Sequence, residues 1–428
     1  MRLALYRLTN NSQSTQANTS RRARSSAAAS ATPTASWARF GDEVLVYADE
    51  ADTAKLAFTE TGRAARRVSE DTLALKRDQM HVVVQNGRMF QQENPRVPVL
   101  LDKGRYLLVK LDPRRARQLR EASPTCYGMF PLRENQVVFD VRDAASARAA
   151  KVAWVNALVQ KVERNSFASK LSHLVSFQTR HSTGSGFRSA STWAREQLKA
   201  LDYVTRFQNI SVNGKPSRNL IADKAGLGPA PRKVVLVTAH LDSVNLSGGP
   251  SAPAPGADDN GSGSAGLLEM ARAFAAHPSV HDVRLILFGG EEQGLFGSLH
   301  YVSSLSQTAR QRVLSVLNMD MIGTLNTPTR SVMLEGAPLS QRLIDGLATA
   351  AATYTSLKVE TSLNPFASDH VPFIKAGVPA VLTIEGADNT NSNIHSSRDT
   401  LDHINHDFAV EILRMNVAFI AGEIGRKV

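Results

Sequence analysis

The chain has 428 residues, a length typical of two domains, and its 42% hydrophobic and 21% charged residues exclude a collagenous, coiled-coil or wholly disordered protein. The single cysteine, Cys126, excludes an internal disulfide and a thiolate metal cluster, so any metal site must use His, Asp and Glu. The net charge of +11 is dispersed, and the one dense basic run, at 114–120, has no interleaved aromatic residues. The sequence therefore predicts no nucleic-acid partner, and without a run of about 18 apolar residues it predicts no membrane span.

Residues 1–36 are rich in Ser, Thr, Asn, Gln and Ala and poor in large apolar side chains. Such a segment buries too little surface to offset the entropy of ordering, so we predict a disordered leader. The arginines at 21–24 and the Ala/Ser run after them resemble an export signal only in part, because the strongly apolar middle region of a signal peptide is missing.

Short β-rich runs alternate with helix-like stretches between residues 37 and 150, for example at 43–48, 81–85 and 106–111. This pattern predicts a small α+β domain, and no cluster of catalytic residue types lies in it. Because the domain precedes a complete catalytic unit, one hypothesis is a pro-region that assists folding or covers the active site. The alternative is a rigid domain that packs away from the site.

Apolar runs of strand length recur over residues 151–428, at 234–238, 285–288, 313–318 and 380–384, with helical patterns between them. This alternation predicts an α/β catalytic domain with a mostly parallel, mixed sheet flanked by helices on both faces. In open sheets of this kind, ligands bind beyond the carboxyl ends of the strands.

Histidines and carboxylates follow these strand ends repeatedly. They are His240, Asp242, Asp258, Asp259, Glu291, Glu292, Asp320, His395 and Asp399. Any one of them could form a turn, cap a helix or lie on the surface, but separate strands rarely deliver two histidines and four carboxylates to one rim by chance. Crowded carboxylates raise one another's pKa unless a cation neutralises them, and this donor set suits zinc or a harder divalent ion. A pair of such ions can activate water, and a Glu outside their ligand set can take its proton.

Six segments resemble, in their order and separation, those of the zinc aminopeptidases of metallopeptidase family 28. They are HLDS at 240–243, PGADDNGSG at 255–263, GGEEQGLFGS at 289–298, NMDMIG at 318–323, SDHVPF at 368–373 and HSSRDT at 395–400. A seventh segment, at 177–186, resembles the entrance segment of these enzymes. The resemblance covers about residues 152–428 and implies a zinc-exopeptidase-like fold.

The resemblance also implies a metal-dependent aminopeptidase that acts on peptides with a free N-terminus and uses two Zn²⁺ per chain. Its ligand set would place His240 and Asp320 on one zinc, Glu292 and His395 on the other, and Asp258 between the two. Glu291 would be the general base and acid, acting on a water molecule that the two ions activate. Secreted relatives imply a secreted or periplasmic location, and nothing in the sequence indicates a particular oligomeric state.

Other residues of these segments have supporting roles in this interpretation. Asp242 and Asp399 are expected to orient the histidine ligands near them in sequence, and Asp259 to be mainly structural. Asp369 and His370 either fix a loop or contact the substrate, and both possibilities stay open. Relatives often carry a tyrosine near the Ser-Asp-His segment that can stabilise an oxyanion, whereas here the residues before Ser368 are Asn-Pro-Phe-Ala.

Two other functions remain possible on this fold. A carboxypeptidase or another amidohydrolase would need a cation for a terminal carboxylate, for which Arg330 and Arg398 are candidates. A non-catalytic binding protein with this fold would typically have lost metal ligands, whereas every ligand position here holds a competent residue.

Overall fold

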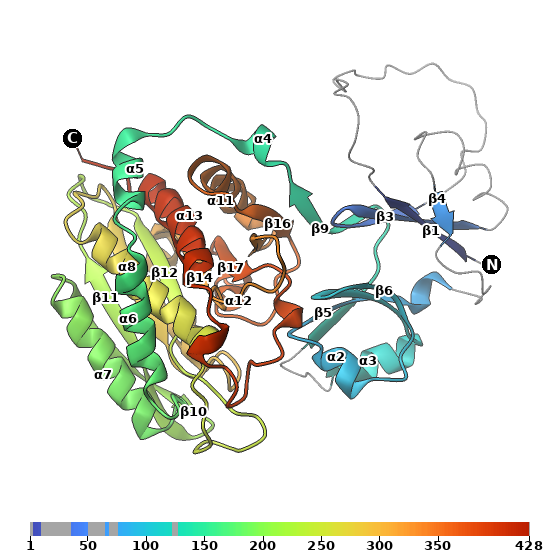
Figure 1. The fold of residues 1–428 in the computed structure, drawn as a ribbon, viewed down its shortest axis with the longest axis horizontal. Helices are drawn as coiled ribbons and strands as arrows, with labels where there is room; N and C mark the ends of the chain where they lie inside the picture. Colours follow the sequence, from blue (N-terminus) through green and yellow to red (C-terminus); the bar gives the residue numbers. More distant parts are fainter. Residues whose placement is uncertain (1–2, 10–35, 50–64, 68–75, 122–126, 428) are drawn as a thin grey trace.

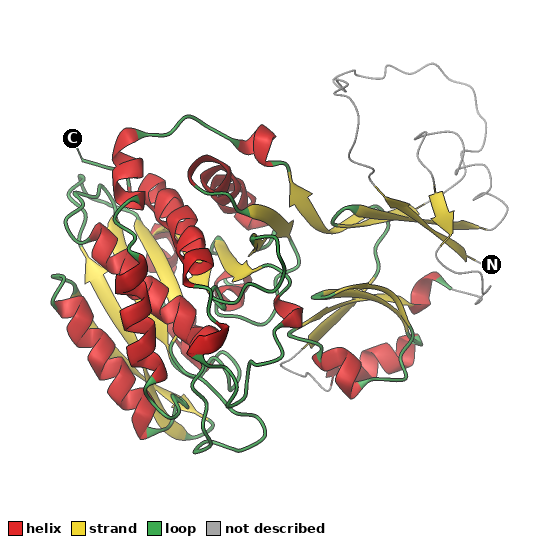
Figure 2. Cartoon of the chain, in the orientation of Figure 1, coloured by secondary structure: helices red, strands yellow, loops and turns green. Residues whose placement is uncertain are grey.

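The structure, a computed structural model, describes residues 3–9, 36–49, 65–67, 76–121 and 127–427. These residues form a larger sheet of 13 strands and a smaller sheet of four (Figures 1 and 2). Among the described residues, no helix has both the length and the apolar composition that crossing a membrane requires.

Eight strands from the second half of the chain form one end of the larger sheet. They are β10 (Val204–Val212), β11 (Lys215–Lys224), β12 (Val234–His240), β13 (Asp282–Phe288), β14 (Val313–Met319), β15 (Ser331–Glu335), β16 (Lys358–Ser362) and β17 (Ala380–Glu385). Their order is β10-β11-β13-β12-β14-β17-β15-β16. The four central strands, β13, β12, β14 and β17, are parallel, whereas β11 and β15 run antiparallel to their neighbours β13 and β17. The four apolar runs are therefore confirmed as strands of a mixed sheet with a parallel centre.

Helices cover both faces of this part of the sheet, as predicted. One face carries α5 (Ala153–Val159), α6 (Arg164–Val175), α7 (Ser185–Lys199), α8 (Gly263–Phe274), α11 (Gln341–Tyr354) and α13 (His406–Ile424). The other carries α9 (Phe296–Ser304) and α12 (His370–Lys375), and the short α10 (Gln307–Arg312) leads into β14. In β12, Val235 and Val237 pack into the first layer and Leu236 into the second, which explains its unbroken apolar run.

The N-terminal part of the chain extends the larger sheet and adds the smaller one. Beyond β16 the larger sheet continues with β9 (Gln136–Arg142), β2 (Ser36–Phe40), β3 (Glu43–Asp49), β1 (Leu3–Thr9) and β4 (Ala65–Arg67). The smaller, antiparallel sheet has the order β6 (Val99–Lys103), β7 (Tyr106–Lys110), β5 (Met80–Gln85) and β8 (Tyr127–Pro131). Helices α2 (Met89–Glu93) and α3 (Pro113–Glu121) pack against it, and α4 (Ala144–Ala147) leads to α5.

One prediction for this region needs correction. Part of the predicted disordered leader, Leu3–Thr9, forms β1, because it finds a full antiparallel partner in β3 that the leader's own sequence does not reveal. Residues 10–35 of that leader lie outside the described residues. The N-terminal domain is joined to the α/β part of the sheet, because β9 pairs with β16.

Candidate metal centre

The predicted site residues gather at the carboxyl ends of the parallel strands. His240 is the last residue of β12, Glu291 and Glu292 follow β13, and Asp320 follows β14. His395 lies in the loop after β17. The segment η2 (Ala257–Ser262), a turn of π-helix that opens α8, brings its acidic pair to the same rim. Parallel strands thus bring His240 and His395, which are 155 positions apart, to one site.

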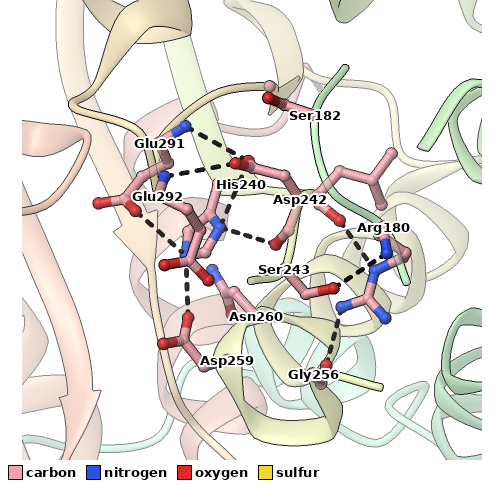
Figure 3. A network of polar contacts seen from close by, with 12 residues as sticks. Arg180, Ser182, His240, Asp242, Ser243, Gly256, Asp259, Asn260, Glu291 and Glu292 are labelled. Carbon is pink, nitrogen blue, oxygen red and sulfur yellow. Dashed lines mark hydrogen bonds and ion pairs between the residues drawn. The ribbon is translucent and has the colours of Figure 1, made fainter. Parts of the chain in front are cut away.

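One carboxylate, that of Asp259, lies between the two histidines (Figure 3 shows the His240 side). Its Oδ1 is 3.2 Å from Nε2 of His240, which also lies 3.2 Å from Asp320 Oδ1. Its Oδ2 is 3.0 Å from Nε2 of His395, which lies 3.1 Å from Glu292 Oε2. The five side chains therefore form two groups of three potential ligands, which share Asp259.

The structure corrects the prediction for Asp258. Its buried carboxylate belongs to neither group of potential ligands, and accepts hydrogen bonds from the Gly323 N–H (2.8 Å) and from Nδ2 of Asn391 (2.8 Å). The place between the two histidines, which was expected for Asp258, is held by the carboxylate of Asp259, whereas the carboxylate of Asp258 binds neighbouring loops. The reason is the backbone of η2, which is non-helical at Asp259 and directs the two adjacent side chains to different partners.

The carboxylate of Asp242 contacts both His240 and the backbone of Glu291 and Glu292. Its Oδ1 is 3.6 Å from Nδ1 of His240, and its two oxygens accept hydrogen bonds from the backbone N–H groups of Glu291 (3.4 Å) and Glu292 (3.3 Å). Figure 3 shows these contacts converging on one carboxylate. Asp242 thus fixes the turn after β13 relative to the end of β12.

Asp399 has a different contact from the expected one. Its carboxylate accepts hydrogen bonds from the N–H groups of Asp258 (2.9 Å) and Asp259 (3.0 Å), so it orients the acidic turn and not His395. Burial, followed by the charge of Asp258, raises the pKa of Asp399 to about 7.

Arg180 is a component that the sequence analysis did not single out. It is fully buried and donates hydrogen bonds to the carbonyls of Leu241 (2.9 Å), Gly256 (2.8 Å) and Leu174 (3.1 Å), and Figure 3 shows the contact with Gly256. Burial lowers its pKa to about 10, against the opposing charges of the nearby carboxylates. The guanidinium therefore ties together the loops that carry His240 and Asp259, and adds one positive charge beside the acidic cluster. Its position in the entrance segment was the only signal in the sequence.

We expect Arg180→Gln to destabilise the protein by at least about 3 kcal/mol, because several buried carbonyls lose their donor at roughly 1–3 kcal/mol each. Arg164→Gln is the matched control. Arg164 is half-exposed and pairs with Asp407 on the surface, so its loss should cost about 1 kcal/mol or less. Urea unfolding followed by circular dichroism measures both, and equal midpoints for the two variants would contradict the structural role of Arg180.

The cluster around His240 and His395 contains more carboxylate groups than these two histidines can neutralise. Burial raises the pKa of Glu291 well above its usual range, and it raises that of Glu292 to about 7. Burial acts to lower the pKa of both histidines. Nearby carboxylates outweigh this effect and raise both pKa values, and the main ones are Asp320 beside His240 and Glu292 beside His395. Oε1 of Glu292 is buried and has no hydrogen-bond partner among the described residues. A cluster with these properties fits divalent cations, which would neutralise it and supply the missing partner.

Glu291 and the Asp369–His370 pair lie beside the ligand groups. Oε2 of Glu291 is 3.9 Å from Nε2 of His240, and the side chain faces the cavity at the cluster. His370 is fully buried, with Nε2 3.5 Å from Oε1 of Glu335, which favours the loop-fixing role over substrate contact. Burial raises the pKa of Asp369 to about 7.

The cavity at the cluster has a volume of about 30 Å³. Asp259, Glu291, Asp320 and His395 line it. No tyrosine lines it among the described residues, and the hydroxyl that does line it, that of Ser368, donates to Asp320 Oδ2 at 2.6 Å. Asn86 and Arg105 of the N-terminal domain also line the cavity. The alternative that this domain packs away from the site is therefore wrong.

The carboxyl ends of the strands thus carry two adjoining groups of potential metal ligands. Residues 219–420 match the family model described as Peptidase family M28, so the chain carries a peptidase domain of that family, and the resemblance inferred from its motifs is confirmed.

Relatives agree with this assignment. Aminopeptidase YwaD of Bacillus subtilis is 34% identical over 194 residues, which are 45% of this chain and 41% of the relative. Leupeptin-inactivating enzyme 1 of Streptomyces exfoliatus is 32% identical over 263 residues, 56% of each chain. The match thus spans less than two thirds of either relative. The crystal structure of the LapA aminopeptidase of Legionella pneumophila shares the fold, with a TM-score of 0.58 at 18% identity, over 81% of this chain and 99% of LapA.

Proposed function

We propose that the chain is a zinc aminopeptidase that hydrolyses the N-terminal peptide bond of substrates with a free amino group. The observation that carries the proposal is the carboxylate of Asp259, which faces one histidine–carboxylate pair with each of its oxygens. The name of one relative, Aminopeptidase YwaD, supports this direction of attack.

The donor set fits two zinc ions. His240, Asp259 and Asp320 would hold one, and Asp259, Glu292 and His395 the other. Each group offers a neutral nitrogen donor and carboxylate oxygens, and contains no thiolate, as zinc sites in hydrolases do. Two such ions would act as Lewis acids on the scissile carbonyl and on the attacking water.

Glu291 is the residue proposed to move the proton. It lies outside both ligand groups and faces the cavity, and burial raises its pKa, which makes its carboxylate a stronger base toward the attacking water. The protonated Glu291 then donates that proton to the leaving amine. Asp242 holds the Glu291 N–H and so fixes the base relative to His240.

The candidate cations for a carboxypeptidase have other partners. Arg330 lies 3.6 Å from Glu411 Oε1, and the exposed Arg398 donates to the Ser392 carbonyl. Neither lines the cavity, and the guanidinium that does, that of Arg105, is paired with Glu335 and Asp388. A non-catalytic binding protein is disfavoured because both ligand groups are complete.

Blocking the substrate's amino group separates the two directions of attack. We expect the zinc-loaded chain to hydrolyse leucine p-nitroanilide with a kcat/KM at least 100-fold higher than that for its N-acetyl derivative, because the acetyl group removes the free amine. An amidated dipeptide, leucylglycinamide, should be cleaved at its first bond. Cleavage of N-acetyl-leucylglycine, together with resistance of the amidated dipeptide, would contradict the aminopeptidase proposal and favour a carboxypeptidase.

A further inference from the structure

We propose that three arginines of the catalytic domain form an exosite, a second substrate-binding site that takes acidic side chains downstream of the scissile bond in longer peptides. This arginine cluster consists of Arg188 and Arg195 on α7 and Arg218 on β11. Figure 1 shows α7 packed along β10 and β11, at the opposite end of the larger sheet from the N-terminal strands. The inference rests on the proposed function, since it takes the metal centre as the place where the N-terminal bond is cleaved.

The arginine cluster has no acidic partner among the described residues. None of its three side chains forms an ion pair there, and the one acidic residue of α7, Glu196, pairs with Lys199. Like charges repel one another, so three gathered cations without an acid make a surface that an anionic ligand would stabilise. Other arginines of the catalytic domain do pair with carboxylates, namely Arg164, Arg206, Arg232, Arg272, Arg284, Arg312, Arg330 and Arg342.

An aromatic ring and polar groups hold two of the guanidinium groups in place. Cζ of Arg218 lies 3.7 Å from the centroid of the Phe207 ring, and Cζ of Arg195 lies 5.2 Å from the same centroid. Arg218 also donates to the carbonyl of Arg188 (2.6 Å) and to Oγ of Ser191 (3.0 Å), which ties β11 to α7. Burial, followed by the charges of Arg188 and Arg195, lowers the pKa of Arg218. The cluster is therefore largely formed before a ligand arrives, which reduces the entropic cost of binding.

The arginine cluster adjoins the rim that carries the metal centre. Because β11 runs antiparallel to β13, Arg218 lies beyond the carboxyl end of β13, the end that Glu291 follows. Beside it, Ser217 donates to the carbonyl of Ser182 (2.7 Å), and the Ser182 hydroxyl contacts Gln293, two positions after Glu291. An extended peptide advances about 3.3–3.6 Å per residue, so residues several positions after the scissile bond are the ones that would reach the cluster.

Three positive charges suit a run of acidic side chains better than a single one. One Asp or Glu of a substrate would neutralise only one arginine, whereas two or three neighbouring acidic residues would neutralise most of the cluster. Each guanidinium presents a planar fork of N–H groups that matches a carboxylate. Among the described residues, no acceptor contacts the exposed side chain of Arg188, so its whole fork is available to a ligand.

The first test measures binding without turnover in the full-length, zinc-loaded chain. The probe is an N-acetylated, fluorescein-labelled decapeptide with three neighbouring glutamates, which should bind at least tenfold more tightly than the same peptide with three glutamines. Arg188→Glu should remove that preference without disturbing the fold, because the side chain is exposed. Arg342→Gln is the matched control, at an exposed arginine of α11 that pairs with Glu423, and should keep the preference. Fluorescence anisotropy measures all three proteins.

The second test measures whether the cluster serves the reaction. The substrates are peptides with a free N-terminal leucine, in which the three glutamates are moved along the chain in steps of two residues. At the spacing that reaches the cluster, KM should be at least tenfold lower than for the glutamine peptide, with kcat within about threefold. Arg188→Glu should abolish this difference in KM. Added salt should reduce it in the wild-type chain, because salt screens exposed charges.

These readouts separate the two proposals. Arg188-dependent binding of the acetylated acidic peptide supports the exosite even if no form of the protein cleaves a peptide, a result that would sink only the aminopeptidase proposal. Equal affinities for the two acetylated peptides, or equal KM values at every spacing, would overturn the exosite. Arg188-dependent binding of inorganic phosphate, with no preference for the acidic peptide, would overturn it as well and make the cluster a phosphate site.

Discussion

Glu291→Gln is expected to lower kcat for leucine p-nitroanilide by about 1,000- to 10,000-fold, at the upper end of what a general acid–base residue contributes. The amide has nearly the same shape as the carboxylate but cannot accept the proton of the attacking water or return it to the leaving amine. Glu291 lies outside both groups of potential ligands, so the variant should keep the metal content of the wild-type chain.

Glu292→Gln is the matched comparison for this prediction. It changes the neighbouring carboxylate in the same way, but Oε2 of Glu292 lies 3.1 Å from Nε2 of His395 within a ligand group. We expect this variant to lose metal as well as activity. Steady-state rates and elemental analysis on both proteins check the distinction, and near-normal turnover of Glu291→Gln would show that the base is another residue.

Asp259→Asn is expected to reduce bound zinc from about two ions per chain to one or none, and to lower activity at least 1,000-fold. The variant loses the one carboxylate that serves both ligand groups. A neutral amide also leaves the two histidines without the charge that lies 3.0–3.2 Å from their nitrogens.

Asp258→Asn is the adjacent control and should keep both ions. Its carboxylate accepts hydrogen bonds from Gly323 and Asn391, and an amide can accept only one of the two without a clash of donors. We expect a loss of about 1–3 kcal/mol in unfolding free energy, with activity within tenfold of wild type. Metal loss in Asp258→Asn together with metal retention in Asp259→Asn would restore the assignment that the sequence alone favoured.

The parallel centre of the sheet could be predicted because its strands are local apolar runs. The position of the site at the carboxyl ends of these strands could be predicted from them in turn. Residues such as His240 and Asp320 are adjacent to those runs, so topology alone brings them together. Which of Asp258 and Asp259 faces the histidines depends instead on backbone angles within a six-residue turn. Two identical neighbouring side chains give no sign of those angles in the sequence.

Contacts between distant parts of the chain were beyond sequence reasoning. Arg105 and Glu335 are 230 positions apart, and neither belongs to a recognisable motif. The pairing of β9 with β16 likewise joins two strands of ordinary composition. Arg180 was missed for a related reason, since a single arginine is usually a surface residue, and only burial against three carbonyls reveals its role.

The central claim, that Asp259 joins two metal sites of an aminopeptidase, is tested most directly by elemental analysis of metal per chain, combined with the leucine p-nitroanilide assay before and after chelation. We predict about two zinc ions per chain, loss of activity when they are removed, and recovery when zinc is added back. A chain that binds one zinc or none at saturating zinc, or that hydrolyses the anilide equally well after complete chelation, would contradict the account.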